Sequence, residues 1–164
     1  MHTPSAPVPP DLVCDLLVVG SGAGGLSTAI TARKLGLDVV VVEKAPVFGG
    51  TTAFSGGVLW IPGSRHDRAG DTRAAMRSYL QDQAGRFFDA PAAEAFLEHA
   101  SAMVDWFERE TAVQFVPTLY PDYHPDAPGG AQVGRSILAA PFDASALGKE
   151  LARLRPPLET ITFM

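Results

Sequence analysis

The first third of the chain alternates between apolar runs and a glycine-rich turn, and this pattern predicts a strand, a helix and a second strand. Residues 13–19, Asp15 aside, and residues 37–42 are apolar runs rich in valine and leucine. Apolar runs without alternation are typical of strands buried on both faces of a parallel sheet. Between them, residues 26–35 have apolar positions near helical spacing, and Gly36 follows as a stop. The whole pattern fits into about thirty residues, the length of one βαβ unit.

The rest of the chain predicts two helices, a short strand and two long loops. Residues 45–70 are rich in Gly, Pro, Ser and Thr and predict an ordered loop. A helix is predicted over residues 72–84 with Asp71 as its cap, and a stronger one over 91–110 with Asp89 near the cap and Pro91 in the first turn. The remaining expectations are a flexible leader at 1–11, a short strand at 113–116 and a long loop at 119–140, which contains three prolines and a glycine pair.

These elements predict an α/β fold: a Rossmann-like βαβ unit with parallel strands, followed by helices and a long loop, in an incomplete domain. The chain has 164 residues, of which 46% are hydrophobic, enough for one core of ordinary size. The formal net charge is −5, and the 13 Lys and Arg residues are scattered. A nucleic-acid surface would show a basic stripe, so no nucleic-acid partner is expected.

Targeting and redox features add little to this interpretation. No apolar run is long enough for a transmembrane segment, and the proline-rich start lacks the basic and apolar regions of a secretory signal. The single cysteine, Cys14, cannot form an internal disulfide, which indicates a cytoplasmic location. Its place in an apolar run predicts a packed core thiol.

The turn after the first predicted strand contains the pattern G-x-G-x-x-G, from Gly20 through Gly22 to Gly25. Alone the pattern is weak, but here it directly follows a buried strand and opens a helix, as a dinucleotide site requires. Gly20 permits the tight turn, Gly22 lets a pyrophosphate approach the backbone, and Gly25 lets the helix pack closely on the strand. The helix N-terminus would then supply free N–H groups to the phosphates. A purely structural glycine turn is the alternative.

A carboxylate stands at the end of the second predicted strand. Glu43 lies 18 residues after Gly25, where an acidic side chain accepts hydrogen bonds from the adenosine ribose. It would also repel a 2′-phosphate, which argues against NADP. The alternative is a solvated strand-end carboxylate.

Two further glycine groups favour FAD over NAD. Gly49 to Thr52 and Ser55 to Gly57 combine glycines with hydroxyl side chains soon after the ribose acid. Such residues let a backbone run beside a long, extended cofactor, whereas a plain NAD domain usually continues into its next helix and strand. Turns within a loop, or an NAD-binding module, are the alternatives.

Residues 14–62 resemble the start of the FAD-binding flavoproteins related to fumarate reductase. Within that group they are most similar to the 3-ketosteroid 1-dehydrogenase branch, in which segments like GGTT, SGG and WIP occur together. The likeness continues at residues 120–123, 134–136 and 141–148. The resemblance implies an FAD-dependent oxidoreductase that acts on a CH–CH group beside the ketone of a small, steroid-like substrate.

The resemblance also implies roles for individual residues. Tyr123 matches a tyrosine that reaches the active site and supports a second tyrosine, much later in the chain, in removing a proton next to the ketone. A loop tyrosine with a buried ring is an equal alternative. The residues expected to bind the cofactor, from the pyrophosphate through the ribose to the flavin side, are Gly20, Ser21, Gly22, Ala23, Gly24, Gly25, Glu43, Lys44, Gly49, Gly50, Thr51, Thr52, Ser55, Gly56 and Gly57.

The family's enzymes are much longer than this chain. Residues 12–164 are therefore expected to be the N-terminal part of an FAD-binding domain, without the substrate domain, the proton-abstracting tyrosine and the C-terminal FAD segment. A catalytically inactive remnant with weak or no cofactor binding is the alternative. No metal site is expected, because His66, His99 and His124 lack ligand spacing. Arg135 is expected in a loop salt bridge and Trp60 in a packed position.

Overall fold

The computed structural model describes residues 11–158, so the predicted leader lies outside the described residues except for Asp11. The chain divides into two compact units, described separately below. Unit 1 comprises residues 1–54 and 147–164, of which 11–54 and 147–158 are described, and unit 2 comprises residues 55–146.

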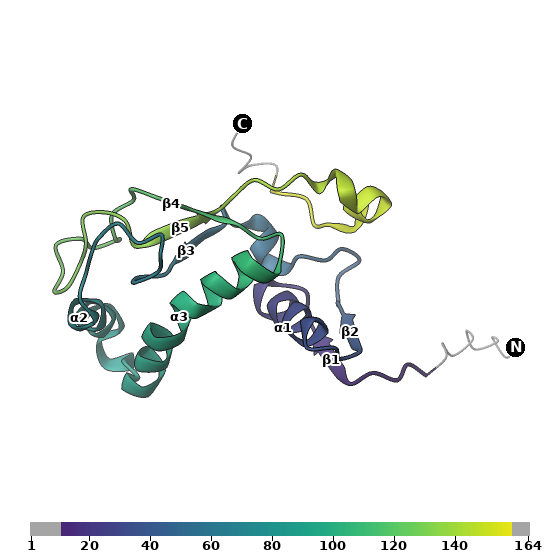
Figure 1. The fold of residues 1–164 in the computed structure, drawn as a ribbon, viewed down its shortest axis with the longest axis horizontal. Helices are drawn as coiled ribbons and strands as arrows, with labels where there is room; N and C mark the ends of the chain where they lie inside the picture. The colour runs from purple at the N-terminus through teal and green to yellow at the C-terminus, as the bar shows by residue number, and fades with distance from the viewer. Residues whose placement is uncertain (1–10, 159–164) are drawn as a thin grey trace, which may run out of the picture. The chain divides into compact units, whose positions relative to one another are not determined.

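Unit 1 contains the predicted strand–helix–strand arrangement. Strand β1 (Leu16–Val19) leads into helix α1 (Ala23–Lys34), which returns to strand β2 (Val39–Val42). The two strands are parallel, with Leu16 opposite Val39, and α1 packs against both (Figure 1). The prediction of a βαβ unit is therefore confirmed.

The apolar residues of β1 are not buried on both faces. Val18 is buried, whereas Leu17 is 55% exposed and Val19 is 79% exposed. In the described part of unit 1 the sheet has two strands, and α1 is the helix that contacts them, so one face of β1 stays open. The expectation of two-sided burial is wrong for these residues. Cys14 precedes β1 and is half-buried, so the expectation of a packed core thiol in a strand is also wrong.

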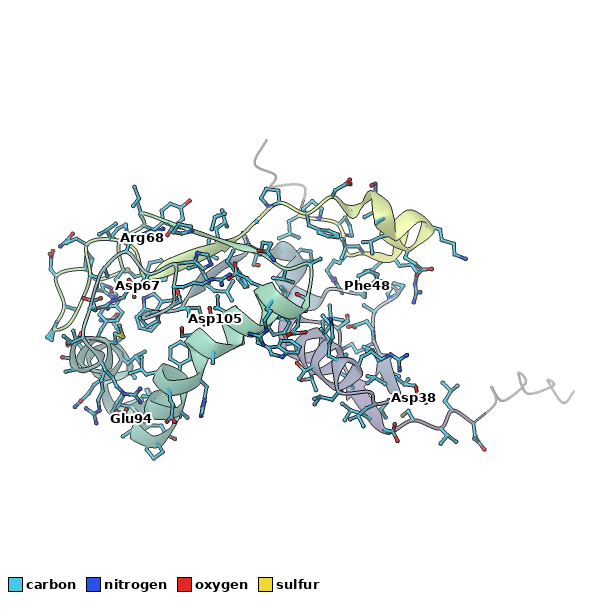
Figure 2. The ribbon with its side chains drawn as sticks, in the orientation of Figure 1. Asp38, Phe48, Asp67, Arg68, Glu94 and Asp105 are labelled. Atoms are coloured by element: carbon cyan, nitrogen blue, oxygen red, sulfur yellow. The ribbon has the colours of Figure 1, made fainter. Side chains whose placement is uncertain are left out.

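The later part of unit 1 brings a distant segment back to the βαβ unit. The short 3-10 helix η1 (Gly50–Phe54) follows β2. The kinked 3-10 segment η3 (Ala144–Arg153), which belongs to unit 1 from Leu147 on, precedes Leu154. Phe48 and Leu154 form a parallel bridge, and Figure 2 shows Phe48 beside this returning segment. The guanidinium of Arg155 lies 5.2 Å from the centre of the Phe54 ring. Residues 153–155 are thereby fixed against the chain that follows β2.

Unit 2 combines an antiparallel sheet with two helices. Its strands lie in the order β3 (Val58–Trp60), β5 (Ser136–Ala139) and β4 (Phe115–Pro117). The helices are α2 (Arg73–Ala84), which continues into the 3-10 turn η2 (Gly85–Phe87), and α3 (Ala90–Glu110) (Figure 1).

Aromatic packing and ion pairs join these elements of unit 2. The Trp60 ring of β3 stacks on Phe96 of α3 at a centroid distance of 6.0 Å and is tilted against Tyr79 of α2 at 5.7 Å. Glu94 of α3, labelled in Figure 2, accepts hydrogen bonds from Arg73 and Arg77 of α2 at 2.8 Å each. The expectation that Trp60 is a packing residue is confirmed.

Two predicted loops and one predicted cap differ from the structure. The expected loop at 45–70 contains η1 and β3, and the expected loop at 119–140 contains β5. Strands β3 and β5 form because these short apolar segments pair with each other. Thr72, rather than Asp71, caps α2 by accepting from the Ala75 amide at 3.2 Å. Asp89 caps α3 as predicted, accepting from the Ala92 amide at 3.0 Å. The short strand expected at 113–116 is β4.

A buried arginine organises the loop between β4 and β5. Arg135 is fully buried, and its guanidinium donates to Asp122 Oδ2 at 2.7 Å, Asp71 Oδ2 at 2.5 Å and the Gly129 carbonyl at 2.6 Å. Trp60 Nε1 donates to Asp122 Oδ1 at 2.7 Å. The predicted salt bridge of Arg135 is confirmed, and Asp71 is absent from the helix cap because its carboxylate binds Arg135.

A second buried carboxylate fixes the C-terminal end of α3. Glu108 accepts from His66 Nε2 at 3.0 Å and from the Phe115 amide at 2.9 Å, and it forms an ion pair with Arg65. Burial raises the pKa of Glu108, but the hydrogen bonds from Phe115 and His66 and the charge of Arg65 outweigh it, so the pKa lies below its usual 4.5.

A lowered folded-state pKa makes the contribution of Glu108 to stability depend on pH. Such a carboxyl stabilises the fold above its ordinary pKa of 4.5 and loses that contribution as the pH falls through the lowered value. We expect Glu108→Gln to lower the melting temperature more at pH 7 than at pH 3, measured by circular dichroism. An equal difference at both pH values would contradict this assignment.

Candidate cofactor-binding site

The glycine turn at the end of β1 has the geometry that the sequence predicts. Gly20 has a φ of +99°, which favours glycine, and its amide donates to the Val42 carbonyl at 2.7 Å. A Cβ on Gly25 would lie 2.0 Å from the Gly20 carbonyl oxygen. Helix α1 therefore packs so closely on the turn that no side chain fits at Gly25, as predicted.

The N-terminus of α1 is open at Gly22, which is the cap residue in extended conformation. Gly22 has no side chain with which to cap the helix, and the first turn of α1 has no acidic residue. A Cβ on Gly22 would meet only Thr52 Oγ1, at an ordinary contact distance of 3.7 Å. The fold itself thus leaves room for a Cβ at Gly22, in the space where the sequence predicts that a pyrophosphate approaches the backbone.

The second glycine group lies directly against the first. Thr52 Oγ1 accepts from the Ala23 amide at 2.9 Å. A Cβ on Gly50 would lie 3.0 Å from Gly22 Cα, and its φ is +53°. The structure therefore brings Gly50 and Thr52 to the N-terminus of α1, as expected for a backbone that follows the same ligand.

Glu43 is fixed by the loops on both sides of it. Its Oε2 accepts from the Ser21 amide at 3.0 Å and the Ser21 hydroxyl at 2.5 Å, and its Oε1 accepts from the Ala45 amide at 2.9 Å. The hydrogen bonds from Ala45 and Ser21 lower the pKa of Glu43 to about 2 despite partial desolvation. Ser21 Oγ in turn accepts from the Gly49 amide at 2.9 Å. Glu43 is consequently an ionised acceptor with a fixed position.

A cavity of about 390 Å³ opens beside Glu43, within the usual size range of small-molecule sites. Most of its lining residues are apolar, and two are charged, a carboxylate and a guanidinium. The lining residues are Ser21, Leu26, Val41, Glu43, Ala45, Pro46, Val47, Phe48 and Arg153. An ionised acceptor for ribose hydroxyls, apolar residues for a base and a helix N-terminus without an acidic residue for phosphates suit the adenosine diphosphate half of FAD. Sequence reasoning missed Phe48 and Arg153, because the fold alone brings residues 153–155 to this place.

The remaining predicted residues lie at the edge of unit 1 or in unit 2. Lys44 and Thr51 are exposed in unit 1. Ser55, Gly56 and Gly57 begin unit 2, where the Gly57 carbonyl accepts from the Ala139 amide at 2.9 Å. Tyr123, also in unit 2, is 98% exposed, so its interpretation as a buried ring is wrong.

A parallel βαβ unit with a glycine turn, an open helix N-terminus and a strand-end carboxylate beside a cavity defines a dinucleotide-binding fold. The family model described as "FAD binding domain" matches residues 15–162, and the chain belongs to this family. The expected cofactor, FAD, is therefore confirmed. The alternative that the chain is an NAD-binding module is wrong.

Similar proteins are dehydrogenases. The chain is 44% identical to 4-oxocyclohex-2-ene-1-carboxylate 5-dehydrogenase of Sinomonas cyclohexanicum over 92% of its length and 26% of that protein. It is 42% identical to 3-oxosteroid 1-dehydrogenase of Mycolicibacterium smegmatis over 87% of its length and again 26% of the relative. The expected resemblance to the 3-ketosteroid branch is thus confirmed. The chain spans about a quarter of the length of these relatives.

A solved structure supports the same fold. The chain matches the 3-ketosteroid Δ1-dehydrogenase of Sterolibacterium denitrificans, in complex with 1,4-androstadiene-3,17-dione, with a TM-score of 0.83 and 38% identity. The match covers 88% of this chain and 26% of that one. Among residues 11–158, no helix is long and apolar enough to cross a membrane.

The carboxylate of Glu43 offers a direct test of the ribose assignment. We expect Glu43→Gln to weaken ADP binding roughly tenfold or more, since hydrogen bonds to a charged acceptor are lost. The measurement is calorimetric titration with ADP at pH 7. Because the pKa of Glu43 is about 2, wild-type affinity should not change through this group between pH 5 and pH 8.

Asp38→Asn is the control, because Asp38 is an exposed carboxylate in the same unit and pairs with Arg33 outside the cavity. Equal ADP affinity of Glu43→Gln and wild type would remove Glu43 from the site.

Proposed function

We propose that the protein with this chain is an FAD-dependent dehydrogenase that oxidises a CH–CH group next to the ketone of a cyclic substrate. The observation that supports this most directly is the fixed, ionised Glu43 beside a cavity and a glycine turn, in a chain about 40% identical to ketone dehydrogenases. The single cysteine supports a cytoplasmic location.

In this proposal, different residues of the chain bind different parts of the cofactor. The glycine turn and the first amides of α1 (Gly20, Ser21, Gly22, Ala23, Gly24, Gly25) hold the pyrophosphate. Glu43 accepts from the ribose hydroxyls, with Lys44 beside it. Gly49, Gly50, Thr51 and Thr52 extend toward the flavin side, followed by Ser55, Gly56 and Gly57. When bound, FAD supplies a two-electron acceptor.

A cyclic ketone is the substrate class that the relatives have in common. Their names give 3-oxosteroids and a 4-oxocyclohexene carboxylate as substrates, and both contain a ring ketone. Tyr123 is the residue of this chain that we assign to the active site. Tyr123 is exposed, so its hydroxyl is accessible to a substrate. The preceding residue, Asp122, is fixed by hydrogen bonds from Arg135 and Trp60.

Flavin content and dye reduction test the proposal. The purified protein should show flavin absorbance and reduce a dye with a 3-oxosteroid or with 4-oxocyclohexanecarboxylate, and the preferred compound identifies the substrate. Tyr123→Phe should reduce turnover without changing flavin content. Flavin without activity on any cyclic ketone would favour the catalytically inactive alternative, and absence of flavin would contradict the cofactor site.

A further inference from the structure

We propose that Arg153 recognises the adenine base, by stacking its guanidinium on the ring in the cavity beside Glu43. This inference rests on the proposed binding of the adenosine half of FAD in that cavity. It concerns a residue that lies far from the glycine motif in the sequence and belongs to the segment that returns to unit 1.

The backbone holds Arg153 at the cavity independently of its side chain. The Phe48 amide donates to the Arg153 carbonyl at 2.8 Å, and the Arg155 amide donates to the Phe48 carbonyl at 2.8 Å. A Cβ on Gly49, whose φ is +116°, would lie in van der Waals contact with this segment, 3.4 Å from Leu154 Cδ1. These contacts fix the position from which the Arg153 side chain extends.

The guanidinium of Arg153 is available to a ligand. Its side chain is 68% exposed, and its ion pair is with Glu150, which is 44% exposed. Exposed pairs of this kind contribute little stability, so moving the guanidinium over a base costs little. A planar guanidinium stacks on flat rings, which an ammonium group does poorly.

The cavity suits an uncharged planar group better than an anion. Besides Arg153 the lining includes Leu26, Val41 and Val47, which give an apolar surface. Glu43 in the same cavity is ionised, because its pKa is about 2, and would repel a phosphate. With one negative and one positive side chain, the cavity has no excess of positive charge for an anion. A purine can pack between the apolar wall and the guanidinium while its ribose meets Glu43.

ADP titration of flavin-free protein tests this inference. We expect Arg153→Ala and Arg153→Lys each to weaken ADP binding about fivefold. Arg33→Ala should leave the affinity unchanged; Arg33 is a matched control, because it is 69% exposed, belongs to unit 1 and pairs with an acidic residue outside this cavity. Melting temperatures of the variants should equal that of the wild type.

Each other outcome has a definite meaning. If Arg153→Lys retains wild-type affinity while Arg153→Ala loses it, charge alone matters and stacking is overturned. If neither variant changes ADP binding, Arg153 has no part in the site, and the proposed function is unaffected. If the wild-type protein binds no ADP, the dinucleotide site itself fails, and this inference fails with it.

Discussion

Gly22→Val is expected to abolish cofactor binding while leaving the fold nearly intact. The backbone at Gly22 has a φ of −73° and a ψ of −175°, which valine readily adopts, and the nearest atom to an added Cβ is 3.7 Å away. The side chain would instead fill the space in front of the α1 N-terminus, where the pyrophosphate needs to approach the backbone. ADP affinity should fall roughly a hundredfold or more, measured by calorimetric titration.

Gly25→Ala provides the contrasting variant. Its Cβ would lie 2.0 Å from the Gly20 carbonyl oxygen, so the helix must move away from the turn. We expect this variant to lose both binding and stability, whereas Gly22→Val loses binding alone. Normal flavin content in Gly22→Val would show that the motif is only a structural turn.

The difference between these two glycines shows what sequence could predict about the site. The order of apolar run, glycine pattern and apolar run specifies local structure, so the βαβ unit and the close packing at Gly25 follow from neighbouring residues. Glu43 also follows from neighbouring residues, because it comes directly after the second apolar run. The Ser21 hydroxyl donates to Glu43 and accepts from the Gly49 amide. In the sequence, only the presence of a hydroxyl side chain inside the glycine motif indicates these hydrogen bonds.

Features that depend on distant segments could not be predicted in this way. Strands β3 and β5 are short and far apart in the sequence. They form strands because the fold brings them together and they pair. Phe48 and Arg153 meet at the cavity for the same reason. Asp71 and Thr72 are both able to cap a helix, and the choice between them depends on Arg135, which only the folded chain brings near.

Arg135→Met is expected to cause the largest loss of stability in unit 2. Arg135 is fully buried, and the carboxylate of its partner Asp122 is only 1% exposed. Methionine fills much of the arginine's volume but leaves Asp122 without its cation, and Asp71 also loses its partner. Removing one member of a buried ion pair typically costs about 3–5 kcal/mol. The free energy of unfolding should fall by roughly that amount in urea titrations.

Two further variants separate the loss of charge pairing from the loss of packing. Arg73→Met removes an arginine that is 50% exposed and pairs with Glu94, so we expect a change of less than about 1 kcal/mol. Asp122→Asn, added to Arg135→Met, removes the orphaned charge and should recover part of the stability. Equal losses for Arg73→Met and Arg135→Met would contradict the buried-pair argument.

The same network ties the stability of unit 2 to its proposed chemistry. Asp122 accepts from Trp60 Nε1 at 2.7 Å, from the Ala131 amide at 3.0 Å and from Arg135, and Tyr123 is the next residue. The Tyr123 ring is exposed and is not held by a hydrophobic core. Its position therefore depends on the backbone at residues 122–123, which the contacts of the Asp122 side chain fix. Arg135→Met should therefore lower kcat on a cyclic ketone at temperatures where the variant is still folded. Unchanged turnover in folded Arg135→Met would show that Tyr123 does not depend on this network.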